Sequence, residues 1–159
     1  MYIHRIMTTR KQQPKTLRTD ARALVETCAG WNSRLAARRI SNFLDREMAA
    51  AGLTVTQVGL MAQIAAMTDD TLGTLAKRSG LEQSTLSRNL RTLENAGLVE
   101  IAVVETDLRR RAVWLTETGA RQLEAAIPVW REAHAKLSRL ISPDLAVRLA
   151  EQTERLAGA

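Results

Sequence analysis

Cysteine and histidine are scarce in this chain of 159 residues, which holds one cysteine, Cys28, and two histidines, His4 and His134. A single cysteine excludes a disulfide within the chain and favours a reducing compartment. Zinc usually takes three or four Cys, His or carboxylate ligands, and nucleophilic catalysis needs a histidine or equivalent base beside the nucleophile. We therefore expect no metal site, no cofactor and no enzyme activity.

Aromatic residues and long apolar runs are also rare. Aromatics make up 3% of the residues, whereas 45% are hydrophobic and mostly Ala, Leu and Val, which predicts a mainly helical domain. Residues 48–68 carry no charge, but Gly52 and several Thr and Gln residues interrupt this stretch. They favour one helix ending and another beginning over a membrane span. The basic N-terminus lacks the apolar run of a secretory signal, so we expect a cytoplasmic protein.

Positive charge is concentrated at the N-terminus. The net charge is +6, and residues 1–22 supply +5 of it through six Lys or Arg side chains against Asp20. The remaining body is nearly neutral, so the basic composition alone is a weak sign of nucleic-acid binding. Residues 1–18 show no periodicity and are predicted to form a flexible basic arm. A solvated tail and a DNA-contacting arm both remain open for it.

Helical periodicity dominates the rest of the chain. We expect a long helix over about residues 19–51, closed by Gly52, and then a helix over about 55–67 capped by Thr54 or Thr56. A short helix follows from Thr71 to Gly80. After residues 82–96, the β-branched segments "LVEIAVVE" and "RRAVWLT" predict two strands joined by a tight turn at "TDLR". Two further helices are expected, one from Thr116 and one starting at Ser142-Pro143.

The segment "GLEQSTLSRNLRTLENAGLV", residues 80–99, has two different faces. Leu86, Leu90 and Leu93 form a narrow stripe suited to burial. The opposite side carries short hydroxyls and arginines, which suit phosphates and base edges. A short helix, a glycine turn, this amphipathic helix and a hairpin predict a winged helix-turn-helix. The candidate DNA-binding residues on the second helix are Gln83, Ser84, Thr85, Ser87, Arg88 and Arg91.

Two neighbouring segments extend this predicted surface. Thr71, Thr74 and Lys77 on the preceding helix are candidates for phosphate contacts. The hairpin tip "TDLRRR" places three arginines together, and the narrow, negative minor groove of A·T-rich DNA is a suitable partner for them. We expect Arg109 to enter that groove, Arg110 and Arg111 to contact phosphate, and Asp107 to brace one arginine.

The segments "GLTVTQVGLMAQIA", "LAKRSGLEQSTLSRNLRTLENAGLV" and "DLRRRAVWLTETG" resemble, in order and spacing, the MarR family of bacterial transcriptional regulators. The resemblance covers about residues 24–157. It implies a homodimer in which residues 19–52 and 117–159 form a helical dimerisation region and residues 53–116 form the winged DNA-binding domain. It also implies recognition of a pseudo-palindromic operator, usually for repression, and release of DNA when a small aromatic or anionic effector or an oxidant acts. Compared with the family pattern, the N-terminal arm is long and the wing turn is short.

Three residues are candidates for sensing. Cys28 lies where some relatives carry a peroxide-sensing cysteine, although a small buried hydrophobe explains its position in line with Leu24 and Trp31 more simply. Trp31 and Trp130 are candidates for an aromatic wall of an effector site, and both also fit a hydrophobic core. His134 is expected at the dimer interface.

The leading prediction is therefore a sequence-specific, homodimeric transcriptional repressor. One alternative is an architectural or weakly specific DNA-binding protein without effector control. An enzyme carrying a winged-helix dimerisation domain is a further alternative, but no Gly-rich strand-turn-helix fingerprint follows in this chain.

Overall fold

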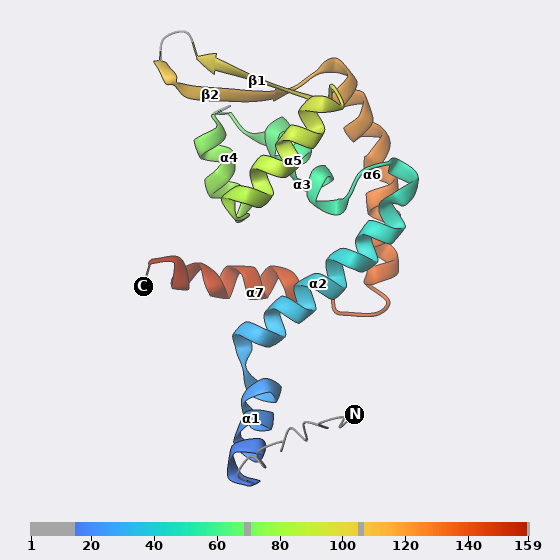
Figure 1. Ribbon diagram of the computed structural model, residues 1–159. Coiled ribbons are helices and arrows are strands. Elements are labelled where there is room, and N and C mark those ends of the chain that lie inside the picture. Colours follow the sequence, from blue (N-terminus) through green and yellow to red (C-terminus); the bar gives the residue numbers. More distant parts are fainter. Residues whose placement is uncertain (1–14, 69–70, 105–106, 159) are drawn as a thin grey trace, which may run out of the picture. The chain divides into compact units, whose positions relative to one another are not determined.

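A computed structural model describes residues 15–68, 71–104 and 107–158, which form mostly helices and one two-stranded hairpin (Figure 1). The predicted fold class, mostly α with a small hairpin, is confirmed. The chain divides into two compact units, residues 1–39 and 40–159. In chain order the elements are α1 (Lys15–Thr27), α2 (Ala29–Glu47), the 3-10 helix η1 (Met48–Ala51), α3 (Val55–Ala66), α4 (Leu72–Ser79), α5 (Gln83–Asn95), β1 (Val99–Val104), β2 (Asp107–Leu115), α6 (Glu117–Leu137), α7 (Leu145–Thr153) and the 3-10 helix η2 (Glu154–Gly158).

The first unit contains α1 and the start of α2, and it corrects two predictions. Helix α1 begins at Lys15, so the expected arm of residues 1–18 is helical at its end, while residues 1–14 lie outside the described part. The expected single helix over residues 19–51 is broken at Cys28. The Asn32 side-chain amide donates to the carbonyls of Glu26 and Cys28, at 3.1 and 3.0 Å. This side chain supplies hydrogen bonds at the break, where Thr27 and Gly30 are weak helix formers.

The second unit has one continuous hydrophobic core. It runs from the end of α2 through the helices and hairpin of the winged domain to α6. The sequence-based domain boundaries at residues 52/53 and 116/117 do not interrupt this core. Its largest fully buried side chains are Met48, Leu60, Met61, Leu75, Leu93 and Val113. Burial of this kind positions α5 and the hairpin as parts of one packed body.

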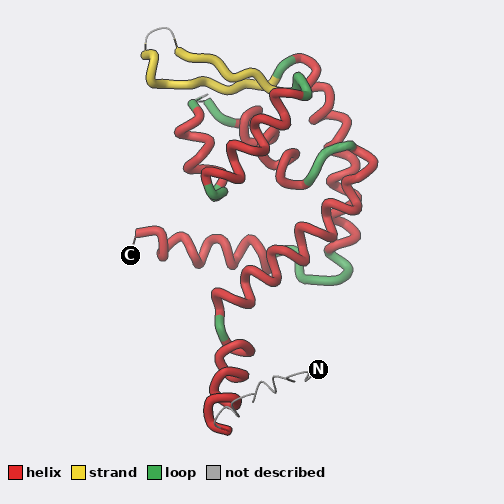
Figure 2. The backbone as a smooth tube through the Cα atoms, in the orientation of Figure 1, coloured by secondary structure: helices red, strands yellow, loops and turns green. Residues whose placement is uncertain are grey.

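Side chains accept hydrogen bonds from backbone N–H groups at the start of helix α3. Thr54 forms a capping box with Gln57, as its hydroxyl accepts from the Gln57 N–H and the Gln57 side chain accepts from the Thr54 N–H. The N–H of Val55 donates to Asp45 Oδ1 of α2 at 2.7 Å. Figure 2 shows that a short loop joins α4 to α5.

Replacing Asp45 by alanine is expected to lower the free energy of unfolding by about 1–2 kcal/mol, because it leaves the part-buried Val55 N–H without its acceptor. Urea unfolding followed by circular dichroism measures the change. Asp45→Asn keeps an acceptor oxygen and should lose less. Equal losses in the two variants would contradict the capping role.

The hairpin forms the wing and differs from its predicted outline. Strands β1 and β2 are antiparallel, and the register pairs Val99 with Leu115 and Ile101 with Val113. The second strand begins at Asp107 rather than after "TDLR", since the register shifts after Val103. Arg109, Arg110 and Arg111 therefore lie in strand β2 and not in the turn. An isolated bridge between Thr71 and Ala112 joins the start of α4 to this strand.

Two further features complete the fold. Helix α7 begins at Leu145, later than the predicted start at Ser142-Pro143, because these residues form a turn in which Ser142 hydrogen-bonds Asp144. In the described part of the chain, no single helix has the length and apolar character needed to cross a membrane. Ala29–Ala51 and Val55–Ala66 reach that threshold only as a bent pair, by length and composition alone.

Candidate nucleic-acid interface

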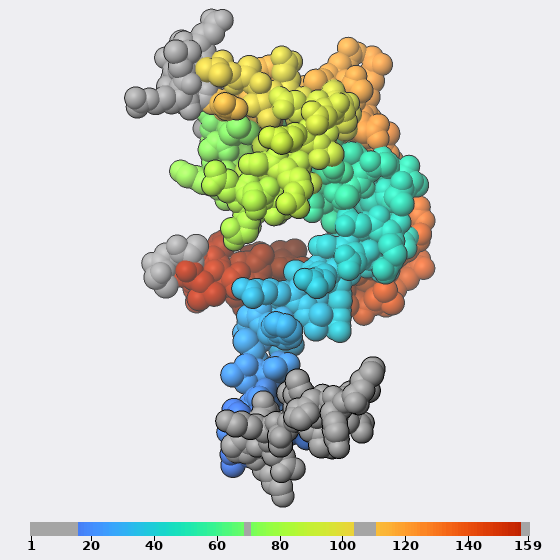
Figure 3. Space-filling model, viewed as in Figure 1, coloured from blue at the N-terminus to red at the C-terminus, as the bar shows by residue number. Residues whose placement is uncertain are grey.

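Helix α5 separates an apolar face from a polar face. Leu86, Leu90 and Leu93 are buried in the core, which confirms the predicted leucine stripe. The polar side is exposed at Gln83, Ser84, Ser87, Arg88 and Arg91, whereas Thr85 is half-buried. In Figure 3 the surface of α5, in yellow-green, is exposed beside that of α4. The helix thus offers hydroxyl, amide and guanidinium groups to solvent on one side.

Some polar side chains on α5 hydrogen-bond to the backbone of their own helix, and others do not. The Asn89 amide donates to the Thr85 carbonyl at 2.9 Å, and the Thr92 hydroxyl donates to the Arg88 carbonyl at 3.0 Å. Both are ordinary bonds back to the preceding turn. Ser84, Ser87, Arg88 and Arg91 have no such bond within the described residues, so their polar atoms can meet a partner outside the chain.

The described basic side chains on α4, α5 and the wing form no ion pair with a described carboxylate. Lys77, Arg88, Arg91 and Arg111 form no ion pair with any of them, and all four are exposed. These unpaired cations make the exposed side of α4 and α5 a candidate surface for a polyanion, although the exposed Glu82 and Glu94 lie near the two ends of α5.

Ion pairs are found instead on α6 and α7. They join Arg121 to Glu117, Arg148 to Asp144, and Lys136 to both Glu132 and Glu47. The hydrogen bond from Lys136 Nζ to Glu47, at 2.8 Å, and a second to Glu132 raise the pKa of Lys136 above its ordinary 10.5. Lys136 therefore keeps its charge over the physiological pH range, and its link between α6 and the end of α2 weakens only as pH rises through that raised pKa.

The three predicted phosphate-binding residues belong to α4 and to its N-terminal cap. Thr71 caps the helix, accepting from the Thr74 N–H, and the hydroxyls of Thr71 and Thr74 are 3.0 Å apart. These threonines therefore have a structural role, whatever they bind. Lys77 and its neighbour Arg78 are exposed in the last turn. Sequence reasoning overlooked Arg78, although the adjacent cations in "LAKRSG" were a signal for it.

The wing is described only in part at its tip. The side chains of Asp107, Arg109 and Arg110 lie outside the described residues, so their predicted contacts stay predictions. Arg111 is exposed, and its partner across the hairpin is Val103. It is the one wing arginine that the structure places at the surface among the described side chains.

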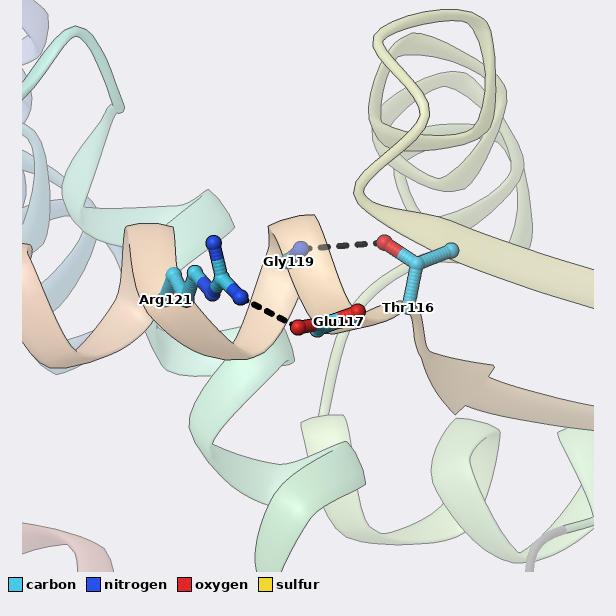
Figure 4. A network of polar contacts seen from close by, with 4 residues as sticks. All are labelled: Thr116, Glu117, Gly119 and Arg121. Carbon is cyan, nitrogen blue, oxygen red and sulfur yellow. Dashed lines mark hydrogen bonds and ion pairs between the residues drawn. The ribbon is translucent and has the colours of Figure 1, made fainter.

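A set of hydrogen bonds around Thr116 joins the end of α5, the wing and α6, and Figure 4 shows its part at the start of α6. The Thr116 hydroxyl donates to the Gly97 carbonyl, just after α5, at 2.6 Å and accepts from the Gly119 N–H at 2.9 Å. The Thr116 N–H donates to the Leu98 carbonyl at 3.1 Å. Gly119 approaches so closely that a Cβ atom there would lie 1.8 Å from the Leu98 carbonyl oxygen. The end of the candidate recognition helix is thereby held against the start of α6.

The candidate sensing residues belong to different units. Cys28 is half-buried at the α1–α2 break, and its neighbours Leu24 and Trp31 are largely exposed. Trp31 lines a hollow of about 240 Å³ with Arg34, Leu35 and Arg38, all on α2. Trp130, in the second unit, stacks on His134 with ring centroids 4.1 Å apart. Among the described residues, no three His, Cys, Asp or Glu side chains gather as metal ligands would.

Comparisons with known proteins agree with this architecture. A sequence model described as the MarR family matches residues 51–110. The transcriptional regulator HosA from Escherichia coli is 39% identical over 66 residues, which cover 35% of this chain and 49% of HosA. The chain thus spans about half the length of the curated relatives it matches.

Solved structures match over a longer range. The M. tuberculosis transcriptional regulator MosR, solved in complex with DNA, is 32% identical, with a TM-score of 0.73, over 82% of this chain and 97% of MosR. The PcaV regulator from Streptomyces coelicolor, solved with its natural ligand, is 19% identical and shares the fold over 85% of this chain and 95% of its own, with a TM-score of 0.69. The chain therefore belongs to the MarR family of transcriptional regulators.

Proposed function

We propose that this protein is a sequence-specific DNA-binding repressor that acts as a homodimer on a pseudo-palindromic operator. The observation that carries the proposal is the exposed face of α5, where Arg88 and Arg91 have no described carboxylate partner and the hydroxyls of Ser84 and Ser87 make no hydrogen bond to a described residue. A helix with these groups, held in front of a hairpin wing, has the layout of a winged helix-turn-helix. The DNA complex of MosR supports the same assignment.

Each polar group has a proposed part in DNA binding. Gln83, Ser84, Thr85, Ser87 and Arg88 lie in the N-terminal half of α5 and face base edges in the major groove. Arg91, Thr71, Thr74 and Lys77 contact phosphates, and Arg78 joins them as an addition from the structure. Asp107, Arg109, Arg110 and Arg111 keep their predicted roles at the wing.

The homodimer is supported by exposed apolar side chains outside the DNA-binding face. Helix α7 buries no side chain within the described chain, and Leu145, Val147 and Leu149 are about half exposed. Leu24 and Trp31 in the first unit are also largely exposed. Apolar surface of this extent marks an interaction site in a folded protein. Light scattering after size exclusion should give twice the chain mass of 17.6 kDa.

Control by a small aromatic or anionic effector or by an oxidant completes the proposal. Cys28 is half-buried rather than fully enclosed, and Trp130 presents part of its ring to solvent. The ligand complex of PcaV supports effector binding on this fold. Measuring the release of bound DNA on adding a candidate effector or an oxidant identifies the signal that acts.

The testing experiment is a fluorescence-anisotropy titration with the DNA upstream of the gene, against a scrambled duplex, at about 150 mM salt. A repressor should bind the upstream DNA at least about 10³-fold more tightly. Equal binding to both duplexes would favour the alternative of an architectural protein. Release by a mild oxidant that Cys28→Ser abolishes would identify a redox signal, whereas release that persists in this variant would exclude Cys28 as the sensor.

Arg109→Ala is expected to weaken binding about fivefold, on the order of 1 kcal/mol, at operators with A·T-rich flanks, because it removes a cation from the narrow minor groove. The same titration on an operator with G·C flanks is the control and should change much less. A uniform loss on both operators would place Arg109 on phosphate instead.

A further inference from the structure

A pocket inside the winged domain has no part in the roles assigned above. It is a hollow of about 250 Å³ between helix α3 and the turn that joins α4 to α5, and Cys28, Trp31 and Trp130 do not line it. Since drug-sized ligands occupy about 300–1,000 Å³, it suits a smaller molecule, such as one fused ring system. We call it the turn pocket, and it includes Thr56, Gly59, Leu60 and Gln63 of α3 and Ser79 and Leu81 at the turn.

Gln63 brings an unpartnered hydrogen-bond acceptor to the turn pocket. Its side-chain Oε1 atom is buried and accepts no hydrogen bond from the described residues. No other buried side-chain nitrogen or oxygen of the described residues lacks a partner in this way. A buried acceptor without a donor costs free energy, because it has lost its hydrogen bonds to water. A ligand that donates a hydrogen bond to Oε1 would recover that cost on binding.

The rest of the wall restricts the chemistry of such a ligand. Leu60 is buried and Leu81 is half-buried, and both offer apolar surface. Thr56 and Ser79 add hydroxyl groups, but no described residue of the lining carries a charge. A carboxylate or an ammonium group would lose water here without meeting an opposite charge. The turn pocket therefore favours an uncharged aromatic molecule with one hydrogen-bond donor.

Gly59 leaves room in the turn pocket for a ligand. It lies inside α3, where glycine is less stable than alanine, and no atom lies within 4 Å of a Cβ atom added to it. Packing within the described chain therefore does not require glycine at this position. A larger side chain here would occupy the space that we assign to the ligand.

We propose that the turn pocket binds a small uncharged aromatic donor and that its occupancy is coupled to the position of helix α5. The turn itself forms one wall. The Leu81 N–H donates to the Ser79 hydroxyl at 3.3 Å, and this hydroxyl donates to the Ala76 carbonyl at 3.1 Å. Helix α5 begins just after this turn, at Gln83.

The coupling follows from the two walls of the turn pocket. A ligand that contacts Gln63 on one side and Leu81 on the other fits best at one spacing between α3 and the turn. It therefore shifts the equilibrium toward that spacing and displaces the start of α5. The coupling to DNA rests on the proposed function, whereas the ligand site itself does not.

An NMR titration of the full-length protein tests the site with indole and benzofuran. These molecules have the same shape, but benzofuran lacks the N–H donor. Indole should shift the methyl signals of Leu60 and Leu81 saturably, with a dissociation constant on the order of 1 mM for so small a ligand. Benzofuran should bind about tenfold more weakly, because it leaves Gln63 Oε1 without a donor. Gln63→Leu should remove this difference between the two ligands.

Gly59→Leu should abolish indole binding, because the new side chain fills the turn pocket. Gly73→Leu is the matched control. Gly73 lies inside α4, also has no atom within 4 Å of an added Cβ, and does not line the pocket. It should keep the parent's affinity for indole, and circular dichroism checks that both variants remain helical.

Fluorescence anisotropy with operator DNA measures the coupling. Indole near saturation should weaken operator binding of the parent protein by at least about fivefold. The operator affinity of Gly59→Leu should not respond to indole.

The contrary outcomes separate the site from the proposed function. Equal binding of indole and benzofuran by the parent protein, absence of a saturable shift, or indole binding that survives Gly59→Leu would overturn the site. Binding of indole-3-carboxylate as tight as that of indole would overturn the preference for an uncharged ligand. Saturable binding without a change in operator affinity would overturn the coupling to α5. Absence of specific operator binding without any ligand would refute the proposed function, while the NMR titration would still decide the site.

Discussion

Replacing Gly119 by alanine is expected to lower the free energy of unfolding by about 3 kcal/mol, because the added methyl group would overlap the backbone at Leu98. The added Cβ would lie 1.8 Å from the Leu98 carbonyl oxygen and 2.8 Å from its carbonyl carbon. Relief would require the start of α6 to move away from the β1 strand. That movement would break the hydrogen bonds of Thr116 to Gly97 and Gly119, which join the end of α5 to the start of α6.

Urea unfolding at a fixed protein concentration measures this loss, since the stability of the proposed homodimer would depend on concentration. Gly59→Ala is the matched control, because Gly59 is an exposed residue inside α3 with no atom within 4 Å of the added Cβ. It should raise stability by about 0.5–1 kcal/mol through helix propensity. If Gly119→Ala lowered the free energy of unfolding by no more than the size of the change at Gly59, the backbone around Gly119 would accommodate the methyl group at little cost. The contacts between the end of α5 and the start of α6 would then be weaker than the structure indicates.

The winged domain could be predicted from sequence because its signals are local. The leucine spacing of α5 and the glycines that follow α4 and α5 are short-range features, and each element formed where they placed it. Gly80 and Gly97 both adopt the left-handed conformation that closes a helix. The spacing of the buried leucines and the glycines at the helix ends both predict the same helix boundaries in this segment.

The remaining features depend on contacts between distant residues. Nothing near Val55 in the sequence indicates that Asp45 accepts its N–H, and nothing near Gly119 indicates the Leu98 carbonyl. The start of β2 was misplaced because the register shift after Val103 depends on the pairing of both strands. The break at Cys28 was missed because the apolar spacing continues through it, and the Asn32 side chain that hydrogen-bonds there gives no periodic signal.

Replacing Arg88 by alanine is expected to weaken binding to the specific operator by about 1–3 kcal/mol, or roughly 5- to 150-fold, with little effect on scrambled DNA. Arg88 is exposed in the N-terminal half of α5 and has no described carboxylate partner, so its guanidinium is available for a bidentate contact with guanine. Arg91→Ala should behave differently. If Arg91 contacts phosphate, all sequences should bind more weakly to a similar degree, and the slope of log affinity against log salt should fall by about 1.

Arg121→Ala provides the matched control for both substitutions. It removes the same charge from an exposed helical arginine, but Arg121 is already paired with Glu117 on α6. Anisotropy titrations of the three variants, on operator and scrambled duplexes at several salt concentrations, separate loss of base recognition from loss of charge. If Arg88→Ala matched Arg121→Ala on the operator, α5 would not read bases through Arg88. The exposed face of α5 would then bind the backbone alone, as the architectural alternative requires.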